Sequence, residues 1–331
     1  MNVFTLAEID AKSSEIEAAL EATDEIDRWC SGPDWVIPVH HGFAPDASTL
    51  LLETTASATP GFALLARYRL ADGRRMLAGL EPLWGFASPL IGSDIGVLAS
   101  SLATHLSIDD GWDVLVLPGM PMPETPTAFT AEVVRALGTL GEVRIGEGMT
   151  RQVVDLADGY DEWLARRSRT FRRNLRHAAE RAAREGVTYE SVSDYDGVFE
   201  RLLAVEERSW KGADDSGITS SEMRATYAAM TERLASQGRL RAHVARCGGE
   251  DIGYIVGGVR AGRYRGLQLS FVQEAESLSV GHLLQSHQLQ LLVTDDEAVS
   301  YDLGMDFEYK RRWADRTVTS FTVVIEREVR P

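Results

Sequence analysis

The chain has 331 residues, of which 50 are acidic and 34 basic, so its formal net charge is −16. This length predicts two domains of roughly 150 residues each, and a membrane span is excluded because no uncharged apolar run reaches about 18 residues. Cys30 and Cys247 lie far apart without metal-ligand spacing, and the first residues lack a basic start followed by an apolar block. We therefore expect a cytoplasmic protein with free thiols and no secretion signal.

The charge is unevenly distributed. Residues 1–150 carry 8 basic and 21 acidic side chains, a net −13, whereas residues 151–331 carry 26 and 29, a net −3. An acidic surface repels nucleic acid and anionic membranes at long range, so DNA is not an expected partner. Three lysines stand against 31 arginines, so arginine is the ordinary basic residue here and each lysine is an unusual choice.

The first half is predicted to be mixed α/β. Asp72-Gly73 separates two β-compatible runs and predicts a hairpin, and the His40-His41 pair is interpreted as part of a loop, not a metal site. The other expected elements, in chain order, are an acidic helix near 13–29, a Pro/Gly-punctuated segment at 32–38, a helix at 94–106, a buried strand at 112–120, a helix at 125–141 and an extended segment at 142–156.

A domain boundary is predicted near 152–162, which divides the chain into domains 1–154 and 155–331. After an arginine-rich helix, the second half reads as strand 187–192, helix 195–210, loop 211–217, helix 219–238, antiparallel strands 240–247, 252–262 and 263–272, helix 279–293, and strands 298–304 and 320–328. Tight glycine turns join the three antiparallel strands. The fold class is therefore α/β (α+β).

The stretch "RRSRTFRRNLRHAAERAAR", residues 166–184, holds eight arginines. At about 100° per residue six of them share one third of the helix circumference, opposite an apolar stripe that includes Phe171 and Ala178. The arginine side is either an ordinary solvated face or a phosphate site, because guanidinium groups bind phosphate in bidentate fashion. The candidate phosphate ligands are Arg169, Arg172, Arg173 and Arg176.

Two further segments carry candidate chemistry. In "LSFVQEAESLSVGHLL" a strand leads through Ser279-Val280-Gly281 into a helix, whose free N–H groups suit a phosphate, although a plain turn is the alternative. In "YDLGMDFEYKRRWAD" acids, tyrosines and the rare Lys310 follow a strand. A second rare lysine, Lys211, lies beside Trp210 in a Gly/Asp loop, and both are candidates for binding substrate or phosphate.

Four segments carry a family resemblance: "SRTFRRNLRHAAERAAREG", "EERSWKG", "SVGHLL" and "DLGMDFEYKRRWA", in this order. Together they resemble GNAT-superfamily acyltransferases of the cellulose-biosynthesis or Fem-like type. The resemblance implies two GNAT-like domains, each a mixed, largely antiparallel sheet flanked by helices, with the acyl-donor site in the second. It further implies that the backbone amides of Ser279, Val280, Gly281 and His282 hold the donor pyrophosphate, and that Lys310 supports the transferring carbonyl or a substrate phosphate.

The leading hypothesis is transfer of an acyl group, acetyl above all, from acyl-CoA to the amine of a small-molecule acceptor. A carboxylate would remove the amine proton, with Asp306 the first choice and Glu207 the second. Lys310 would stabilise the oxyanion, and Tyr309 would protonate the leaving group. No metal is required.

Two other functions remain open. Aminoacyl-tRNA would replace acyl-CoA as donor, as in Fem-type enzymes, and the arginine helix favours this whereas the acidic first half opposes it. Alternatively, the chain is a non-catalytic GNAT-fold binding module, because the presumed phosphate loop keeps a single glycine and has Glu274 and Glu276 nearby. The acceptor and the oligomeric state are not fixed by the sequence.

Overall fold

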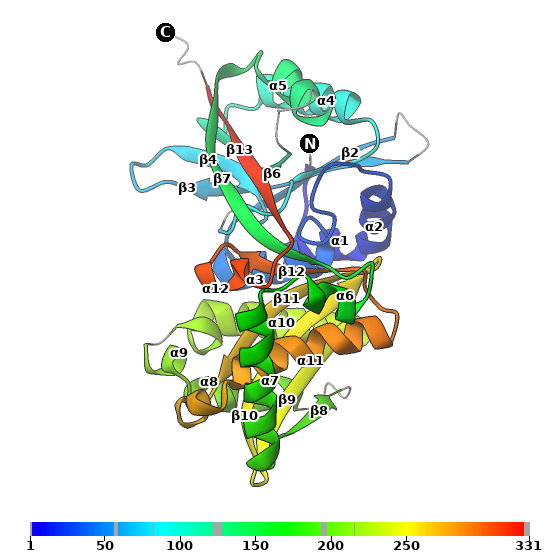
Figure 1. The fold of residues 1–331 in the computed structure, drawn as a ribbon. Coiled ribbons are helices and arrows are strands. Elements are labelled where there is room, and N and C mark those ends of the chain that lie inside the picture. The colour runs from blue at the N-terminus through cyan, green and yellow to red at the C-terminus, as the bar shows by residue number, and fades with distance from the viewer. Residues whose placement is uncertain are drawn as a thin grey trace. The chain divides into compact units, whose positions relative to one another are not determined.

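A computed structural model describes residues 2–55, 59–81, 83–121, 128–192, 197–214 and 216–327 (Figure 1). The chain divides into two compact units, one made of Met1–Thr150 with Thr319–Pro331 and the other of Arg151–Val318. Both divisions fall inside strands, β7 (Gly141–Asp155) and β13 (Arg316–Arg327). The predicted boundary at 154/155 also lies in β7, but most of the last strand, expected in the second domain, belongs to the first unit.

The first unit is built around a sheet of strand order β1-β2-β3-β4-β6-β13-β7, with β5 paired to β3. Its elements are β1 (Asn2–Val3), α1 (Leu6–Ala11), α2 (Ser13–Glu21), α3 (Pro33–Phe43), β2 (Thr49–Thr54), β3 (Gly61–Arg69), β4 (Arg75–Gly79), β5 (Leu90–Ile91), α4 (Ile95–Ile108), β6 (Val114–Met120), α5 (Ala128–Leu137) and β7. The predicted hairpin is confirmed as β3–β4, closed by a hydrogen bond from Leu70 N to Arg74 O.

Two predictions for this unit are wrong. The acidic helix ends at Glu21, and residues 33–43, expected as a punctuated segment and a loop, form helix α3. Pro33 occupies the first helical position, where its missing N–H would have no intrahelical partner in any case. His40 and His41 therefore lie on the last turns of a helix.

The second unit has the strand order β7-β12-β11-β10-β9-β8. Its elements are α6 (Tyr160–Ala165), α7 (Arg169–Arg184), β8 (Thr188–Val192), α8 (Val198–Glu207), α9 (Trp210–Ala213), η1 (Gly217–Thr219), α10 (Ser221–Ser236), β9 (Leu240–Cys247), β10 (Glu250–Arg260), β11 (Arg263–Phe271), η2 (Gln273–Leu278), α11 (Val280–Thr294), β12 (Ser300–Met305) and α12 (Glu308–Arg311). The predicted three-stranded antiparallel segment is confirmed as β9–β10–β11. The loop predicted at 211–217 instead contains most of α9 and the start of η1.

Helices cover both faces of this second sheet. A side chain at Gly253 in β10 would collide with Val280 and Leu284 of α11, whereas the next residue, Tyr254, hydrogen-bonds Glu206 of α8. Successive strand residues point to opposite faces, so α11 lies on one face and α8 on the other. Helix α7 packs against α11 through Ala178, Ala182 and Leu283.

The two units share a topology that the sequence suggested only as a coarse rhythm. In each, an antiparallel strand pair leads through a helix to a strand that pairs in parallel: β3-β4-α4-β6 in the first unit and β10-β11-α11-β12 in the second. The fold class predicted from the sequence, two mixed and largely antiparallel sheets flanked by helices, is confirmed.

A pair of histidines joins α11 to strand β9, and the burial of one of them predicts that the protein loses stability in acid. His243 of β9 is 4 % exposed and contacts the ring of His287 at 5.4 Å. Burial, His287 and Arg241 lower the pKa of His243 to about 4, against the smaller opposing effect of Glu297. A buried histidine held neutral destabilises the native state as pH falls from about 6.5 towards 4. We expect the thermal midpoint to fall more steeply over this range in the wild type than in His243→Gln; equal slopes would contradict this.

Candidate active site

Strands β11 and β12 separate where the candidate catalytic residues gather. They pair in parallel only from Arg263↔Ser300 to Arg265↔Asp302, and beyond this register each strand continues without the other. Gly304 of β12 has φ +79°, and a Cβ there would stand 3.6 Å from both Arg265 Nη2 and Lys310 Nζ. Two cationic side chains from different elements therefore meet over a residue that has no side chain.

An ion cluster anchors the paired part of these strands. Asp302 binds Arg151 of β7 and Arg265 of β11, the latter with Nη1 2.6 Å from Oδ1, and all three side chains are at most 17 % exposed. Burial opposes ionisation of Asp302, but Arg265 and Arg151 outweigh it and lower its pKa. Asp302 is therefore a fixed counter-charge. It was not among the candidate site residues predicted from the sequence, because its partners lie far away in the chain.

Lys310 differs from the other cations of this site. It lies in α12, half-buried, and its Nζ makes no hydrogen bond or ion pair with any residue that the structure describes. Its nearest aromatic neighbours are Phe307 and Tyr309, with Nζ 5.0 and 5.9 Å from the ring centroids. Burial, followed by Arg265, lowers the pKa of Lys310 to about 8.

The predicted acids and Tyr309 lie in less suitable surroundings. Asp306 accepts hydrogen bonds from Arg311 Nε at 2.7 Å and from Gln152 at 3.1 Å, and Arg311 holds its pKa below the usual range. A carboxylate so stabilised in its ionised form is a weak base. Tyr309 is 56 % exposed and stacks on Phe307.

The predicted second base, Glu207, is exposed, whereas its neighbour Glu206 is fully buried. Glu206 accepts hydrogen bonds from Tyr254 at 3.1 Å and Gln268 at 3.3 Å. The sequence carried a signal for this, because Glu206 stands four residues after Leu202 and three after Leu203 on the apolar face of α8.

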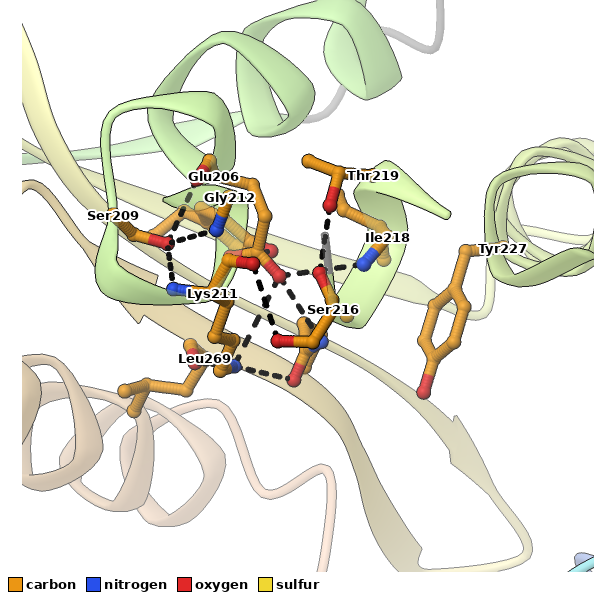
Figure 2. A network of polar contacts seen from close by, with 12 residues as sticks. Glu206, Ser209, Lys211, Gly212, Ser216, Ile218, Thr219, Tyr227 and Leu269 are labelled. Atoms are coloured by element: carbon orange, nitrogen blue, oxygen red, sulfur yellow. Dashed lines mark hydrogen bonds and ion pairs between the residues drawn. The ribbon is translucent and has the colours of Figure 1, made fainter. Parts of the chain in front are cut away.

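Lys211 belongs to the same network. Its Nζ donates to Gln268 Oε1 at 2.9 Å and to the carbonyl of Leu269 at 2.8 Å, and Figure 2 shows its side chain extending from α9 towards Leu269. Burial lowers its pKa, and Glu206 partly offsets this. The role of Lys211 in the described structure is to tie α9 to β11, and the adjacent Trp210 is 55 % exposed.

A cavity of about 760 Å³ lies between α7, the start of α11 and the turn after α12. It is lined by Arg166, Arg167, Ser168, Thr170, Phe171, Asn174, Leu175, Ala178, Ser279, His282, Arg312 and Trp313. Of the predicted ligand-binding residues, Ser279 and His282 line it. Arg167 is held by the carbonyls of Trp313 and Ala314, whereas Arg312 is exposed and forms an ion pair with the exposed Glu308 at 3.3 Å.

The four predicted phosphate-binding arginines do not line this cavity. Arg169, Arg172, Arg173 and Arg176 are exposed, and the cavity-lining residues of α7 occupy the opposite side of the helix. The amphipathic helix itself is confirmed, with Ala178 and Ala182 buried. The periodicity correctly grouped the arginines but assigned them to the side of the helix away from the hollow.

The start of α11 offers backbone N–H groups without a side-chain cap. Its N-cap, Ser279, has a left-handed conformation with φ +58°, and its hydroxyl accepts a hydrogen bond from Arg181 at 3.1 Å. Val280 is fully buried. A Cβ on Gly281 would stand 3.0 Å from the Phe271 ring, so this glycine is explained by close packing of α11 on β11.

In the corresponding segment of the first unit, side-chain carboxylates already accept hydrogen bonds from the free backbone N–H groups. Between β4 and α4, Glu81 is fully buried and accepts hydrogen bonds from the backbone N–H groups of residues 84, 85, 86 and 87. Asp94 caps the first turn of α4 by accepting from Val97 N at 3.0 Å. The second unit has neither device, so its helix start is the one left open to an anion.

A stack of rings forms one wall of the cavity. Trp313, 2 % exposed, lies nearly parallel to Trp163 at 5.5 Å and to His282 at 5.8 Å, with the edge of Phe171 at 5.0 Å. Burial and Arg312 lower the pKa of His282, which favours a neutral ring. The wall therefore consists mainly of aromatic rings, which are common in the lining of binding pockets.

The described residues contain no group of three His, Cys, Asp or Glu side chains placed to hold a metal ion. Nor does any helix in the described ranges have the length and apolarity needed to span a bilayer.

Comparisons with known proteins agree with this geometry. Residues 165–311 match the family model described as an acetyltransferase (GNAT) domain. No curated protein matches the chain. Among solved structures, FemX superposes with TM-score 0.68 at 11 % identity, covering 94 % of this chain and 95 % of FemX.

Two lysylphosphatidylglycerol synthetase structures share the fold as well. The C-terminal domain of the putative enzyme from Agrobacterium fabrum gives TM-score 0.56 at 13 % identity, covering 95 % of this chain and 92 % of that one. L-PGS from Bacillus licheniformis gives 0.55 at 14 % identity, with 96 % and 92 % covered.

Proposed function

Because residues 165–311 form a GNAT acetyltransferase domain and the chain is an acyltransferase of the GNAT superfamily with the tandem, Fem-like fold, we propose that it transfers an acyl group from acyl-CoA to an amine. The new bond joins the acceptor nitrogen to the acyl carbon. The bond that breaks joins this carbon to the thiol sulfur. The acceptor nitrogen loses a proton and the thiol gains one, so no other reactant is consumed.

One observation carries the choice of donor: the cavity of about 760 Å³ adjoins the uncapped start of α11. Backbone N–H groups at a helix start, together with the partial positive charge there, favour phosphate. Arg312 and Arg166 also line the cavity, although Arg312 pairs with Glu308 and Arg166 with Asp158 and Asp315, and the Trp313–His282 stack supplies ring surface for the rest of the carrier. The volume lies within the range of small-molecule sites.

The test is a thermal-shift comparison of acetyl-CoA, CoA and acetyl-pantetheine, which lacks the nucleotide phosphates. A ligand that binds only the folded protein stabilises it, by about 2.7 kcal/mol at a hundredfold excess over Kd. We expect stabilisation by acetyl-CoA and CoA and little by acetyl-pantetheine. Stabilisation by charged tRNA but not by either CoA compound would reject acyl-CoA as the donor.

A second candidate donor, aminoacyl-tRNA, is favoured by the outer side of α7. The side chains of Arg169, Arg172 and Arg173 make no hydrogen bond or ion pair with any described residue, although the chain is strongly acidic. A basic surface of this kind binds phosphate backbones in a salt-dependent manner.

If tRNA binds here, the double variant Arg172→Glu/Arg173→Glu should weaken binding and reduce the slope of log affinity against log salt by about one per lost phosphate contact. Arg263→Glu is the matched control, because Arg263 is equally exposed at the start of β11. The absence of any tRNA shift at low salt would remove this candidate.

A further inference from the structure

The two carboxylates that act on Lys310, Asp302 and Asp306, are both bound by arginines, and the nearby candidate Glu206 is held in a network of its own. Asp302 is held between Arg151 and Arg265, and Asp306 is bound by Arg311. Glu206 is fully buried within its own hydrogen-bond network. These three carboxylates are therefore engaged by other groups, whereas the exposed Glu207 lies on the outer side of α8, away from the buried Glu206 network.

The Nζ of Lys310 has no polar partner among the residues that the structure describes. Its Nζ lies over the rings of Phe307 and Tyr309 and faces Gly304, which has no side chain to cover it. The charged groups that act on it come from several elements: Arg265 of β11 and Lys211 of α9 oppose its protonation, whereas Asp302 of β12 and Asp306 favour it. Burial adds to the opposition.

Resting on the proposed acyl transfer, we infer that Lys310 in its neutral amine form is the general base of the reaction. As the acceptor nitrogen attacks the acyl carbon, the Nζ lone pair takes the proton from that nitrogen. The carbon–sulfur bond then breaks, and the Lys310 ammonium returns the proton to the sulfur. Lys310 ends the cycle as it began, and one thiol is released for each amide formed.

The surroundings of Lys310 suit both proton transfers. Its pKa of about 8 lies close to that of a free thiol, about 8.5, so the return of the proton to sulfur is nearly balanced. General bases work best with a pKa near the operating pH, and enzymes reach this with lysine by burial and by neighbouring cations. An ordinary exposed lysine would stay protonated and would be unable to accept the proton.

In the rival role, Lys310 is a permanent cation that stabilises the oxyanion. Substitution of Lys310 by arginine distinguishes this role from that of a base. Arginine keeps the charge but does not lose its proton in proteins. We expect Lys310→Arg and Lys310→Met each to lose at least about tenfold in turnover. The acyl-CoA donor should still bind both variants, as judged by thermal shift. Lys310→Arg with turnover near wild type would overturn the inference.

A second variant guards against a purely steric loss. Lys310→Cys is alkylated with bromoethylamine, which restores an amine at the same reach but of lower basicity. We expect turnover to recover and the acid limb of the pH–rate profile to move to lower pH. The acceptor amine titrates in the same way with wild type and with the alkylated variant. The test is therefore the difference in the pH of the acid limb between these two proteins. Wild type treated with the same reagent controls for Cys30 and Cys247.

Recovery with an unmoved acid limb, or no recovery in a folded and alkylated protein, would overturn the assignment of Lys310 as base. Failure of the proposed function has a different signature. Wild type would then release no thiol from acetyl-CoA with any of the primary amines offered, drawn from amino sugars, amino acids and peptides.

Discussion

Replacing Asp302 by alanine is expected to lower the free energy of unfolding of the second unit by about 3–5 kcal/mol, because the change removes one partner of a buried ion cluster. Arg265 and Arg151, 4 % and 8 % exposed, would each lose the carboxylate that now compensates their charge. Asp302→Asn should be nearly as damaging, since it keeps the shape but still leaves two positive charges without this anion.

The matched control is Glu308→Ala, which removes a carboxylate that is 85 % exposed. A surface change of this kind usually alters stability by less than about 0.5 kcal/mol. The measurement is hydrogen exchange of the β11 and β12 amides under native conditions, which reports the second unit by itself. Equal protection in Asp302→Ala and Glu308→Ala would show that the cluster contributes little to stability.

Filling the cavity from α7 is expected to weaken donor binding at least tenfold while leaving the fold intact. Asn174 is exposed and lines the cavity, so the indole of Asn174→Trp can occupy the hollow without disturbing the core. An occupied pocket cannot bury the donor, and each tenfold loss of affinity corresponds to about 1.4 kcal/mol.

Ala179→Trp is the control, because Ala179 is exposed on the same helix and does not line the cavity. Calorimetric titration with acetyl-CoA should give a Kd raised in Asn174→Trp and unchanged within about twofold in Ala179→Trp. Equal affinities in the two variants would place the donor outside this cavity and would contradict the proposed site.

Some residues of the candidate site could be predicted from the sequence, but their roles could not. The rarity of lysine correctly drew attention to Lys310 and Lys211, but only the fold separates the two. The Nζ of Lys211 donates hydrogen bonds to Gln268 and to the carbonyl of Leu269, whereas the Nζ of Lys310 makes no polar contact with the described residues. The base predicted after the strand, Asp306, is a reasonable expectation from residue type, yet it is bound by Arg311 five residues later.

The sequence by itself determined the elements whose signals are local. The amphipathic arginine helix, the three antiparallel strands with their glycine turns and the hairpin at Asp72-Gly73 all follow from side-chain periodicity and turn chemistry within a few residues. The burial of Glu206 also had a local signal in its helical spacing on α8, but the sequence analysis chose its neighbour Glu207 instead.

Only the tertiary structure decided which side of α7 faces a cavity. It also decided that Lys310 makes no polar contact with the described residues and that Asp306 is paired with Arg311. These depend on pairings such as Arg151 with Asp302, which are 151 residues apart in the chain. Periodicity assigns a residue to the inside or outside of its own element, but strand register and helix packing determine what it meets there. The charge state and reactivity of Lys310 are therefore properties of the assembled second unit, not of the segment that carries it.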